Sequence, residues 1–474
     1  MENQGVCIGG DFRNLSETIE IRNPYNNELV GICSLAGSKE LEEAIAKAQA
    51  CQEEMANMPS FQRAEILNGI ASGMETERNA LAKLLAMEAG KPLKYALGEV
   101  DRAIQTYRIA AEECKRLPSE YIKLDWTPAG KGKEGVVKYF PIGIVAGITP
   151  FNFPLNLTSH KIAPAIAAGC PIVLKPARST PLSALAMAKI AYNTSLPKGA
   201  LSILPMDRQS GNQLVTDDRF ALLTFTGSPI VGWKMKTMAG KKKVVLELGG
   251  NAGVIVTETA NLELAINKCV SGAFAYSGQV CIHTQRIFVH HSIFSVFVKK
   301  MVDKTKALTI GNPLSVETEI SAMIDAENTE RIREWVDEAK ANGAKILTGG
   351  NIVDSIYMPT ILIDTKPNMK VCANEAFGPI VIVEPYNTFC DAIDAVNNSP
   401  FGLQAGVFTN KIDEETIAFN KLKVGGVIVN DVPTFRVDHM PYGGVKESGI
   451  GREGVKYAIH DMLEPRILVR DSSY

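Results

Sequence analysis

The sequence lacks the patterns of a metal site and of a disulfide framework. Its nine cysteines include no Cys-x-x-Cys pair, and its six histidines show no His-Glu-x-x-His spacing. These absences predict free thiols and no metal ligand set. For most of the cysteines burial is the simplest interpretation, because a free cysteine usually fills space in a core.

Charge and hydropathy exclude two kinds of partner. The net charge is -2 and 22% of residues are charged, so no basic surface is available for nucleic acid or for an anionic membrane. The longest apolar stretch, residues 141–157, is interrupted by prolines and asparagines and cannot span a bilayer as one helix. Residues 1–5 carry neither the positive region nor the apolar core of a signal peptide. We therefore expect a cytoplasmic protein.

Hydrophobic periodicity predicts an α/β fold with more than one lobe, since 474 residues exceed a single hydrophobic core. Helices are expected to dominate up to about residue 117, and residues 118–140 have the pattern of a polar β-ribbon. Short β-rich runs then alternate with helices over residues 142–239, and again from Glu247 to about residue 430, which is typical of parallel βαβ units. Residues 466–470 are expected to add a strand to the ribbon.

Two residues have the chemistry of a covalent catalyst. Cys281 follows a predicted helix (residues 262–273) and a Gly278-Gln279 turn, which leaves its sulfur accessible and room for a close approach at the glycine. Glu247 lies on a very apolar strand, where burial raises the pKa of a carboxylic acid toward that of a usable base. A thiol and such a base indicate covalent acyl chemistry.

Seven segments in order resemble the aldehyde dehydrogenase superfamily, over essentially the whole chain. They are Thr149–Pro154 (TPFNFP), Lys175–Ala177 (KPA), Phe225–Ser228 (FTGS), Glu247–Gly250 (ELGG), Gly278–Cys281 (GQVC), Asn374–Pro379 (NEAFGP) and Pro441–Gly449 (PYGGVKESG). The resemblance implies a Rossmann-like dinucleotide-binding domain (1–117 and 141–247), a catalytic domain (248–441) and an oligomerisation ribbon (118–140 and 455–474). It also implies a homodimer or homotetramer that acts on a small-molecule aldehyde.

The catalytic roles implied by the resemblance fall on four residues. Cys281 is the nucleophile, and Glu247 activates the water that cleaves the thioester. Asn152 donates to the oxyanion together with the backbone N–H of Cys281, and Lys161 matches a further lysine of the family site. From the residues alone, a turn asparagine is the better interpretation of Asn152 beside a proline, and the resemblance reverses this order. For Lys161 the alternative is a solvated helix lysine.

The cofactor implied by the resemblance is NADP or NAD, although no Gly-x-Gly-x-x-Gly fingerprint is present. Lys175 ends a strand and is expected at the adenosine ribose; Ser228 and the helix behind it are expected at phosphate, with a capped helix as the simpler alternative. Glu375 and Phe377 match the pair at the nicotinamide ribose and ring. The full set of expected contacts is Thr149, Pro150, Phe151, Lys175, Ala177, Arg178, Gly211, Phe225, Thr226, Gly227, Ser228, Val231, Leu248, Gly249, Glu375 and Phe377.

Arg178 departs from the family pattern. Many NAD-using members have a glutamate three residues after the strand-end lysine, where it accepts the ribose 2′-OH. A guanidinium at that position attracts a 2′-phosphate instead, which favours NADP. The alternative is an arginine that merely points to solvent.

The expected substrate funnel is polar. By alignment with the motifs, Phe153, His160, His283, Arg436 and His439 should face the tail of the aldehyde. Such a lining favours a short aldehyde that carries hydroxyl, carboxylate, sulfonate or phosphate, because an alkyl chain would leave these groups unpaired. The alternative for Arg436 is an ion pair with an acid such as Asp438 that serves only the loop.

Three functions are compatible with the sequence. The first is oxidation of a short polar aldehyde to the acid through a thiohemiacetal and a thioester on Cys281. The second is a CoA-acylating semialdehyde dehydrogenase, but members of that branch tend to lack the glutamate found here at Glu247. The third is a non-catalytic protein on the same scaffold, which would be expected to lose Cys281.

Overall fold

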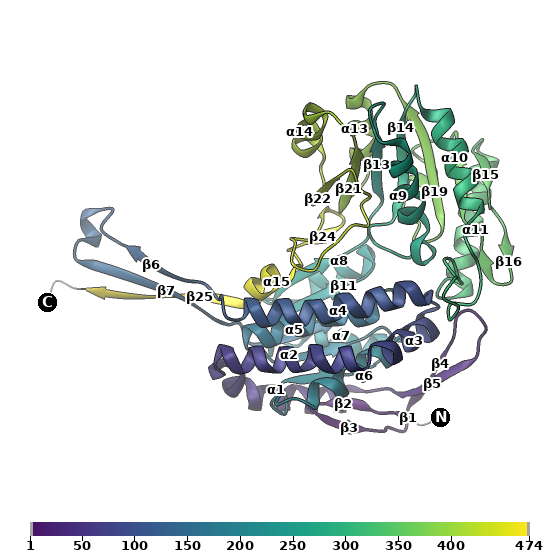
Figure 1. Cartoon of the computed structure of the whole chain (residues 1–474). Coiled ribbons are helices and arrows are strands. Elements are labelled where there is room, and N and C mark those ends of the chain that lie inside the picture. The colour runs from purple at the N-terminus through teal and green to yellow at the C-terminus, as the bar shows by residue number, and fades with distance from the viewer. Residues whose placement is uncertain (1–2, 472–474) are drawn as a thin grey trace.

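The computed structural model describes residues 3–471 and contains two large sheets, helices on their faces and a projecting ribbon (Figure 1). Within these residues the first sheet has eight strands in the order β24-β12-β11-β8-β9-β10-β2-β3. The strands are β2 (Val6–Ile8), β3 (Asp11–Arg13), β8 (Ile144–Ile148), β9 (Ile172–Lys175), β10 (Leu201–Ile203), β11 (Phe220–Thr226), β12 (Lys243–Glu247) and β24 (Gly449–Ile450). The central five, β8 to β12, pair in parallel.

Alternate residues of these strands enter two separate cores. On β8, Val145 packs in one cluster, whereas Ile144, Ala146 and Ile148 pack in the other. The first core is covered by α2 (Ser60–Thr76), α3 (Arg78–Ala89), α4 (Leu93–Glu113), α5 (Pro154–Ala168) and α6 (Leu182–Tyr192). The second is covered by α1 (Ser38–Asn57), α7 (Arg208–Thr216) and α8 (Pro229–Met238). Because both faces are buried, the strands are almost wholly apolar.

The second sheet has the order β15-β18-β19-β14-β13-β21-β22 in the described part of the chain. Its strands are β13 (Ala252–Val256), β14 (Thr284–His290), β15 (Lys345–Thr348), β18 (Thr360–Ile363), β19 (Ile380–Tyr386), β21 (Gln404–Phe408) and β22 (Gly426–Val429). The helices that follow or cover them are α9 (Leu262–Phe274), α10 (Phe294–Lys306), α11 (Ala326–Ala341), α12 (Lys370–Ala373), α13 (Phe389–Asn397) and α14 (Ile412–Lys421). By contrast, α15 (Val455–Asp461) packs against α4 and α5 in the first core.

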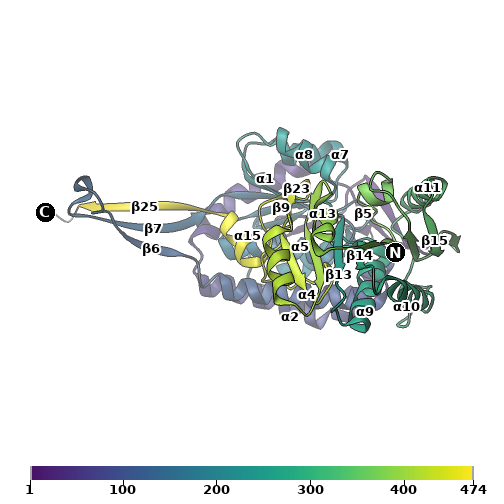
Figure 2. The ribbon, with the colours of Figure 1, turned by 90° about the horizontal axis from the view of Figure 1, so that it is seen from above.

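The ribbon consists of β6 (Ser119–Lys123), β7 (Lys133–Pro141) and the last strand, β25 (Leu463–Asp471). β25 pairs antiparallel with β7 along its whole length, from Leu463 opposite Pro141 to Asp471 opposite Lys133. Figures 1 and 2 show the ribbon extending away from the two lobes. The predicted ribbon and its added C-terminal strand are thus confirmed.

The predicted α/β class with parallel sheets is confirmed, and helices dominate the chain between Ser38 and Glu113 as predicted. The short strands before Ser38 were not predicted: β2 and β3 extend the first sheet, and β1 (Asn3–Gln4), β4 (Thr18–Arg22) and β5 (Leu29–Ser34) form a small sheet of their own. Runs of two to six residues are too short to show a period of two in the sequence.

Some features of the predicted organisation fall outside what the structure describes or tests. Residues 1–2 and 472–474, included in the predicted domains, lie outside the described residues. The domain boundaries themselves stay predictions. Among residues 3–471, no helix combines the length and the apolar character needed to cross a membrane.

Candidate active site

A cavity of about 320 Å³ lies where the loops of the two sheets meet. Three of its walls are the loops that follow β8, β11 and β12, at the carboxyl ends of parallel strands, where open α/β sheets bind ligands. Loops of the second sheet complete it. The lining residues are Pro150, Phe151, Asn152, Leu157, Thr226, Gly227, Ser228, Glu247, Leu248, Gly249, Cys281, Arg331, Glu375 and Phe377. The predicted nucleophile, base and oxyanion donor therefore share one cavity.

Cys281 is held by a strained and well-anchored turn. After α9 the backbone takes left-handed conformations at Tyr276 and Ser277, with φ of 50° and 53°, and at Gly278, with φ of 68°. The Ser277 hydroxyl donates to the Ser321 carbonyl at 2.7 Å, and the Tyr276 hydroxyl donates to the Ala89 carbonyl at 3.1 Å. The sulfur is thereby fixed at the cavity wall, partly exposed.

The backbone at Gly378 fills the space beside Gly278. A side chain at this position would collide with the Gly378 carbonyl. The sequence suggested room for another molecule at this glycine, and the structure corrects that interpretation: the glycine lets the two loops of the second lobe pack together.

Asn152 is positioned by a buried ion pair. Lys91 donates to the Asn152 backbone carbonyl at 2.7 Å and forms an ion pair with Glu99. Glu99 in turn accepts from the first amides of α5, those of Leu155 and Asn156, so it stabilises the helix N-terminus that follows. The Asn152 amide nitrogen donates to the Gln279 carbonyl at 2.9 Å, which places this side chain beside the nucleophile loop.

Glu247 ends β12 and is 3% exposed. Neither of its carboxylate oxygens has a hydrogen-bond partner among the described residues. Burial, and then the negative charge of Glu453, raises the pKa of Glu247 well above its ordinary value. A carboxylate that is desolvated, unpaired and open to the cavity has the properties of a general base.

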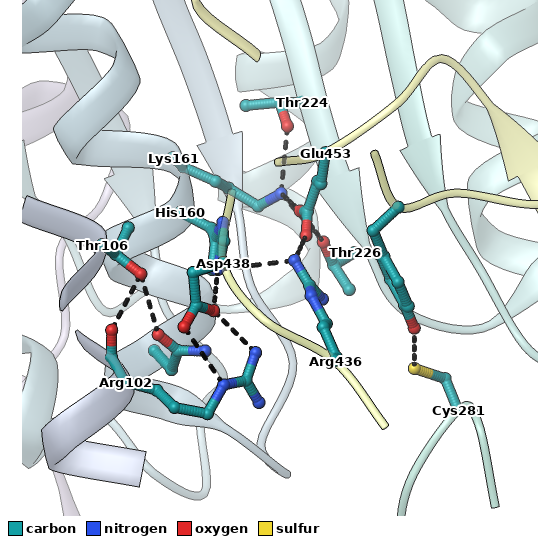
Figure 3. Close-up of polar contacts among 12 residues, drawn as sticks. Arg102, Thr106, His160, Lys161, Thr224, Thr226, Cys281, Arg436, Asp438 and Glu453 are labelled. Carbon is teal, nitrogen blue, oxygen red and sulfur yellow. Dashed lines mark hydrogen bonds and ion pairs between the residues drawn. The ribbon is translucent and has the colours of Figure 1, made fainter. Parts of the chain in front are cut away.

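The charges that act on Glu247 belong to a buried network that includes Lys161, Arg436 and Glu453, whose mutual contacts Figure 3 shows. Lys161 donates to the hydroxyls of Thr224 and Thr226 at 3.0 and 2.8 Å and lies 3.5 Å from Glu453. Arg436 donates to Glu453 at 2.9 Å. The positive charges of Lys161 and Arg436 overcome the effect of burial and lower the pKa of Glu453 to about 2. Lys161 is 1% exposed, so the alternative of a solvated helix lysine is wrong.

The residues that the sequence predicts at the nicotinamide end form a compact group. Glu375 accepts from the Gly250 amide at 2.9 Å, and burial raises its pKa to about 7. The rings of Phe151 and Phe377 meet edge to face with centroids 5.8 Å apart. A side chain at Gly249 would collide with Glu375, so a glycine is required there.

Where the sequence predicts the adenosine end of the cofactor, the structure has a helix N-terminus and a cluster of cations. Gly227 and Ser228 line the cavity at the start of α8. Lys175 packs against Gly211, and its pKa is lowered by burial, with Arg178 and Arg208 acting in the same direction. Ser228 occupies the N-cap position of α8, as predicted, but its hydroxyl makes no capping hydrogen bond to the helix.

The other residues that the sequence predicts as cofactor contacts pack or form hydrogen bonds within these loops and beside them. Phe225 packs under Gly227 and Gly232, Leu248 lines the cavity, and Val231 is packed against the second core. Thr149 bonds to Thr158, and the Ala177 carbonyl closes a turn with Thr180.

In the described part of the chain, none of the predicted substrate residues lines this cavity. His160 contacts Asp438 at 2.8 Å and is 1% exposed, and His283 contacts the Ala273 carbonyl at 2.9 Å. The Phe153 ring lies under Lys91, and His439 is exposed. Both buried histidines have a lowered pKa because burial disfavours their charge, so they are neutral hydrogen-bonding groups rather than cations.

Arg436 has a different partner from the one considered in the sequence. It pairs with Glu453, while Asp438 is taken by Arg102 at 2.7 Å and by His160. Its guanidinium carbon lies 3.7 Å from the centroid of the Tyr442 ring. The alternative pairing of Arg436 with Asp438 is therefore wrong.

Five residues with clear roles in this arrangement were missed in the sequence. They are Lys91, Glu99, Arg208, Tyr442 and Glu453. Tyr442 and Glu453 lie in or beside the glycine-rich 441–454 segment, which was the available signal. The described residues contain no group of three or more His, Cys, Asp or Glu side chains that could hold a metal ion.

Comparisons with known proteins agree with this geometry. The model of the aldehyde dehydrogenase family matches residues 12–468. The chain is 42% identical over 466 residues to 3-sulfolactaldehyde dehydrogenase of Priestia megaterium, covering 98% of this chain and 97% of the other. It is similar to the crystal structure of aldehyde dehydrogenase 21 from Physcomitrella patens in complex with the reaction product succinate, with a TM-score of 0.98, 43% identity, and coverage of 100% and 99%. It is also similar to glyceraldehyde-3-phosphate dehydrogenase of Methanocaldococcus jannaschii complexed with NADP, with a TM-score of 0.92, 37% identity, and coverage of 96% and 100%.

Proposed function

The chain belongs to the aldehyde dehydrogenase family, and from that premise we propose that it oxidises a short polar or anionic aldehyde to the carboxylic acid with NADP or NAD. The observation that carries the proposal is the meeting of Cys281, Asn152 and Glu247 at one cavity with the loops expected to bind the cofactor. The reaction would pass through a thiohemiacetal and a thioester on the Cys281 sulfur.

Acylation of the thiol requires a donor for the developing oxyanion. As the Cys281 sulfur attacks the aldehyde carbon, the carbonyl oxygen gains negative charge, and the Asn152 amide and the Cys281 backbone N–H are the donors proposed for it. Lys91 fixes the Asn152 backbone because its ammonium donates a hydrogen bond to the Asn152 carbonyl oxygen. Such preorganised donors are worth ~10²–10³ in rate each in other acyl-transfer enzymes.

The residues present fit a dinucleotide. Gly227 and the uncapped hydroxyl of Ser228 face the cavity at a helix N-terminus, where anions bind, and Glu375 and Phe377 line its other end. When bound, the nicotinamide ring accepts the hydride that leaves the thiohemiacetal carbon. Glu247 then removes a proton from water, and the resulting attack on the thioester releases the acid and frees the sulfur.

The cofactor preference is tested by Arg178→Glu. Arg178 is exposed close to Lys175 and Asp207, so its guanidinium is placed to pair with a 2′-phosphate. We expect the ratio of kcat/KM for NADP over that for NAD to fall by ~10-fold or more, because a favourable charge pair becomes a repulsive one. Arg116→Glu, an exposed arginine that forms ion pairs with Glu112 and Glu113 on another surface, is the matched control. An unchanged ratio in Arg178→Glu would reject the phosphate contact.

The substrate class is proposed from the relatives. Arg436 does not line the cavity and is paired with Glu453, so its charge gives no support to an anionic substrate. The names of the three compared proteins include a sulfonated aldehyde, succinate and a phosphorylated aldehyde. An anionic group on a short aldehyde is the chemistry that these observations share.

A paired substrate screen tests this proposal. Succinate semialdehyde, sulfolactaldehyde and lactaldehyde are compared with pentanal, with each cofactor, by the absorbance of the reduced nicotinamide. We expect kcat/KM to be at least ~10-fold higher for the polar aldehydes, because an alkyl tail leaves buried polar groups unpaired. Equal or better turnover of pentanal would contradict the proposal. Formation of acyl-CoA when CoA is added would instead support the CoA-acylating alternative.

We also propose that the protein forms a homodimer or homotetramer through its ribbon. Among residues 3–471, β25 is an outer strand of the ribbon with β7 as its one strand neighbour, and Ile467, Leu468 and Val469 on it are about half exposed. An open edge with apolar side chains favours pairing with another chain. Light scattering that gave the mass of a single chain would contradict this proposal.

A further inference from the structure

Tyr442 contacts the reactive sulfur directly. Its hydroxyl oxygen lies 2.9 Å from the Cys281 sulfur, the contact drawn at Cys281 in Figure 3. With a neutral thiol either group can donate this hydrogen bond. With a thiolate only the tyrosine hydroxyl can donate, because the sulfur then has no proton.

The position of Tyr442 is fixed by both its backbone and its ring. Its amide donates to the Glu453 carbonyl at 2.9 Å, and the Glu453 amide donates back to the Tyr442 carbonyl at 2.6 Å. The ring is 3% exposed and packs with Ile282 and Leu403. A donor held this way is preorganised, so little ordering is needed when charge appears on the sulfur.

Arg436 makes this hydroxyl a better donor. Its guanidinium stacks on the face of the Tyr442 ring, 3.7 Å from the centroid, and is itself held by Glu453. A cation over the ring withdraws electron density and makes the phenol proton more acidic. Burial nevertheless raises the pKa of Tyr442 well above its ordinary value, so the hydroxyl keeps its proton and remains a donor.

The thiol needs such a donor because its site disfavours charge. Burial raises the pKa of Cys281 to about 11 even with the hydrogen bond from Tyr442, which acts in the opposite direction. Without this donor still less thiolate would be present at any given pH.

We propose that Tyr442 is a further catalytic residue of this protein: its hydroxyl, backed by the Arg436 guanidinium, donates the hydrogen bond that stabilises the Cys281 thiolate. The proposal rests on Cys281 being the nucleophile of the proposed function. It assigns to the 441–454 segment a part in activating the sulfur.

The expected change in the reaction rate of Cys281 follows from the way in which the pKa of a thiol affects its reactivity. A charge-assisted hydrogen bond corresponds to about one pH unit in the midpoint of thiolate formation. A thiolate with a lower pKa is also less nucleophilic, with a Brønsted coefficient of ~0.4–0.5, so tenfold more thiolate gives only about threefold faster reaction. Removing the hydroxyl should therefore slow the sulfur about threefold below the midpoint and speed it about threefold above.

The test is the pH profile of Cys281 alkylation by iodoacetamide in Tyr442→Phe, without substrate or cofactor. We expect the midpoint to rise by about one pH unit and the two profiles to cross. A purely structural role of the ring would scale the rate equally at every pH. An unchanged midpoint, or a uniform scaling, would overturn the proposal.

Internal and matched controls make the result interpretable. Alkylation of the exposed Cys390 should be identical in all proteins, and the seven buried cysteines should stay unmodified if the variant is folded. Tyr442→Leu is the second variant: it has no hydrogen-bond donor at this position, and it should also show a raised midpoint. Tyr457→Phe, a half-exposed tyrosine on α15, should leave the profile unchanged.

Failure of this proposal is distinguishable from failure of the proposed function. The alkylation profile involves no turnover, so it can contradict the role of Tyr442 while Cys281 remains the nucleophile. Conversely, full turnover in Cys281→Ala would remove the proposed function whatever the profile shows.

Discussion

Replacing Cys281 with alanine is expected to abolish aldehyde oxidation, lowering kcat by at least ~10⁴-fold, as loss of the nucleophile does in other covalent enzymes. Without the sulfur no thiohemiacetal forms, and no bond places the aldehyde hydrogen against the nicotinamide. The loops proposed to bind the cofactor do not depend on this side chain, so binding of NADP, measured by calorimetry, should be retained.

Cys390→Ala is the matched control for this variant. Cys390 is exposed and lies at the start of α13, outside the cavity lining, so its loss should leave kcat within about twofold. Retention of full activity by Cys281→Ala would refute the assignment of the nucleophile. Loss of cofactor binding in the same variant would show instead that the mutation disturbs the fold.

The second large effect is expected from Glu247→Gln. Acylation needs no base at Glu247 in the proposed scheme, so one equivalent of reduced cofactor per active site should form in a burst. Turnover should then slow by ~10²–10⁴-fold, the usual contribution of a general base. Stopped-flow absorbance of the reduced nicotinamide measures both phases, and a normal steady-state rate would exclude Glu247 as the base.

The raised pKa of Glu247 predicts how the rate of deacylation depends on pH. Glu247 acts as a base only when ionised, and its pKa is raised by burial and by Glu453. The rate of deacylation should therefore rise with pH through a limb that lies above the ordinary range of carboxylic acids, and Glu247→Gln should lack this limb. Glu258→Gln, an exposed glutamate paired with Lys411, should retain it.

The chemistry-bearing residues could be predicted from the sequence because each lies in a short motif at a strand or helix end. Cys281 follows a helix, Glu247 ends an apolar strand, and Asn152 follows β8; the structure places all three at one cavity. The loops of Glu247 and Asn152 converge because parallel strands end at the same edge of a sheet, and the Cys281 loop, between α9 and β14, meets them from the second lobe. Local pattern and topology together therefore determine which residues meet.

The supporting residues could not be predicted, because their partners are distant in sequence. Lys91 is 61 residues from Asn152, and Glu453 is 292 residues from Lys161. A lysine or glutamate in an amphipathic segment has the same local pattern whether it is solvated or fully buried in an ion pair. The substrate residues show the same difficulty: alignment placed His160 and His283 near the site, but their ring nitrogens are bonded to other partners.

The most direct test of the central claim is mass spectrometry of Glu247→Gln quenched after one turnover with aldehyde and cofactor. The account predicts that the peptide containing Cys281 gains the mass of the acyl group, in an amount equal to the reduced cofactor formed. Reduced cofactor with an unmodified Cys281, or an acyl group on another residue, would contradict it.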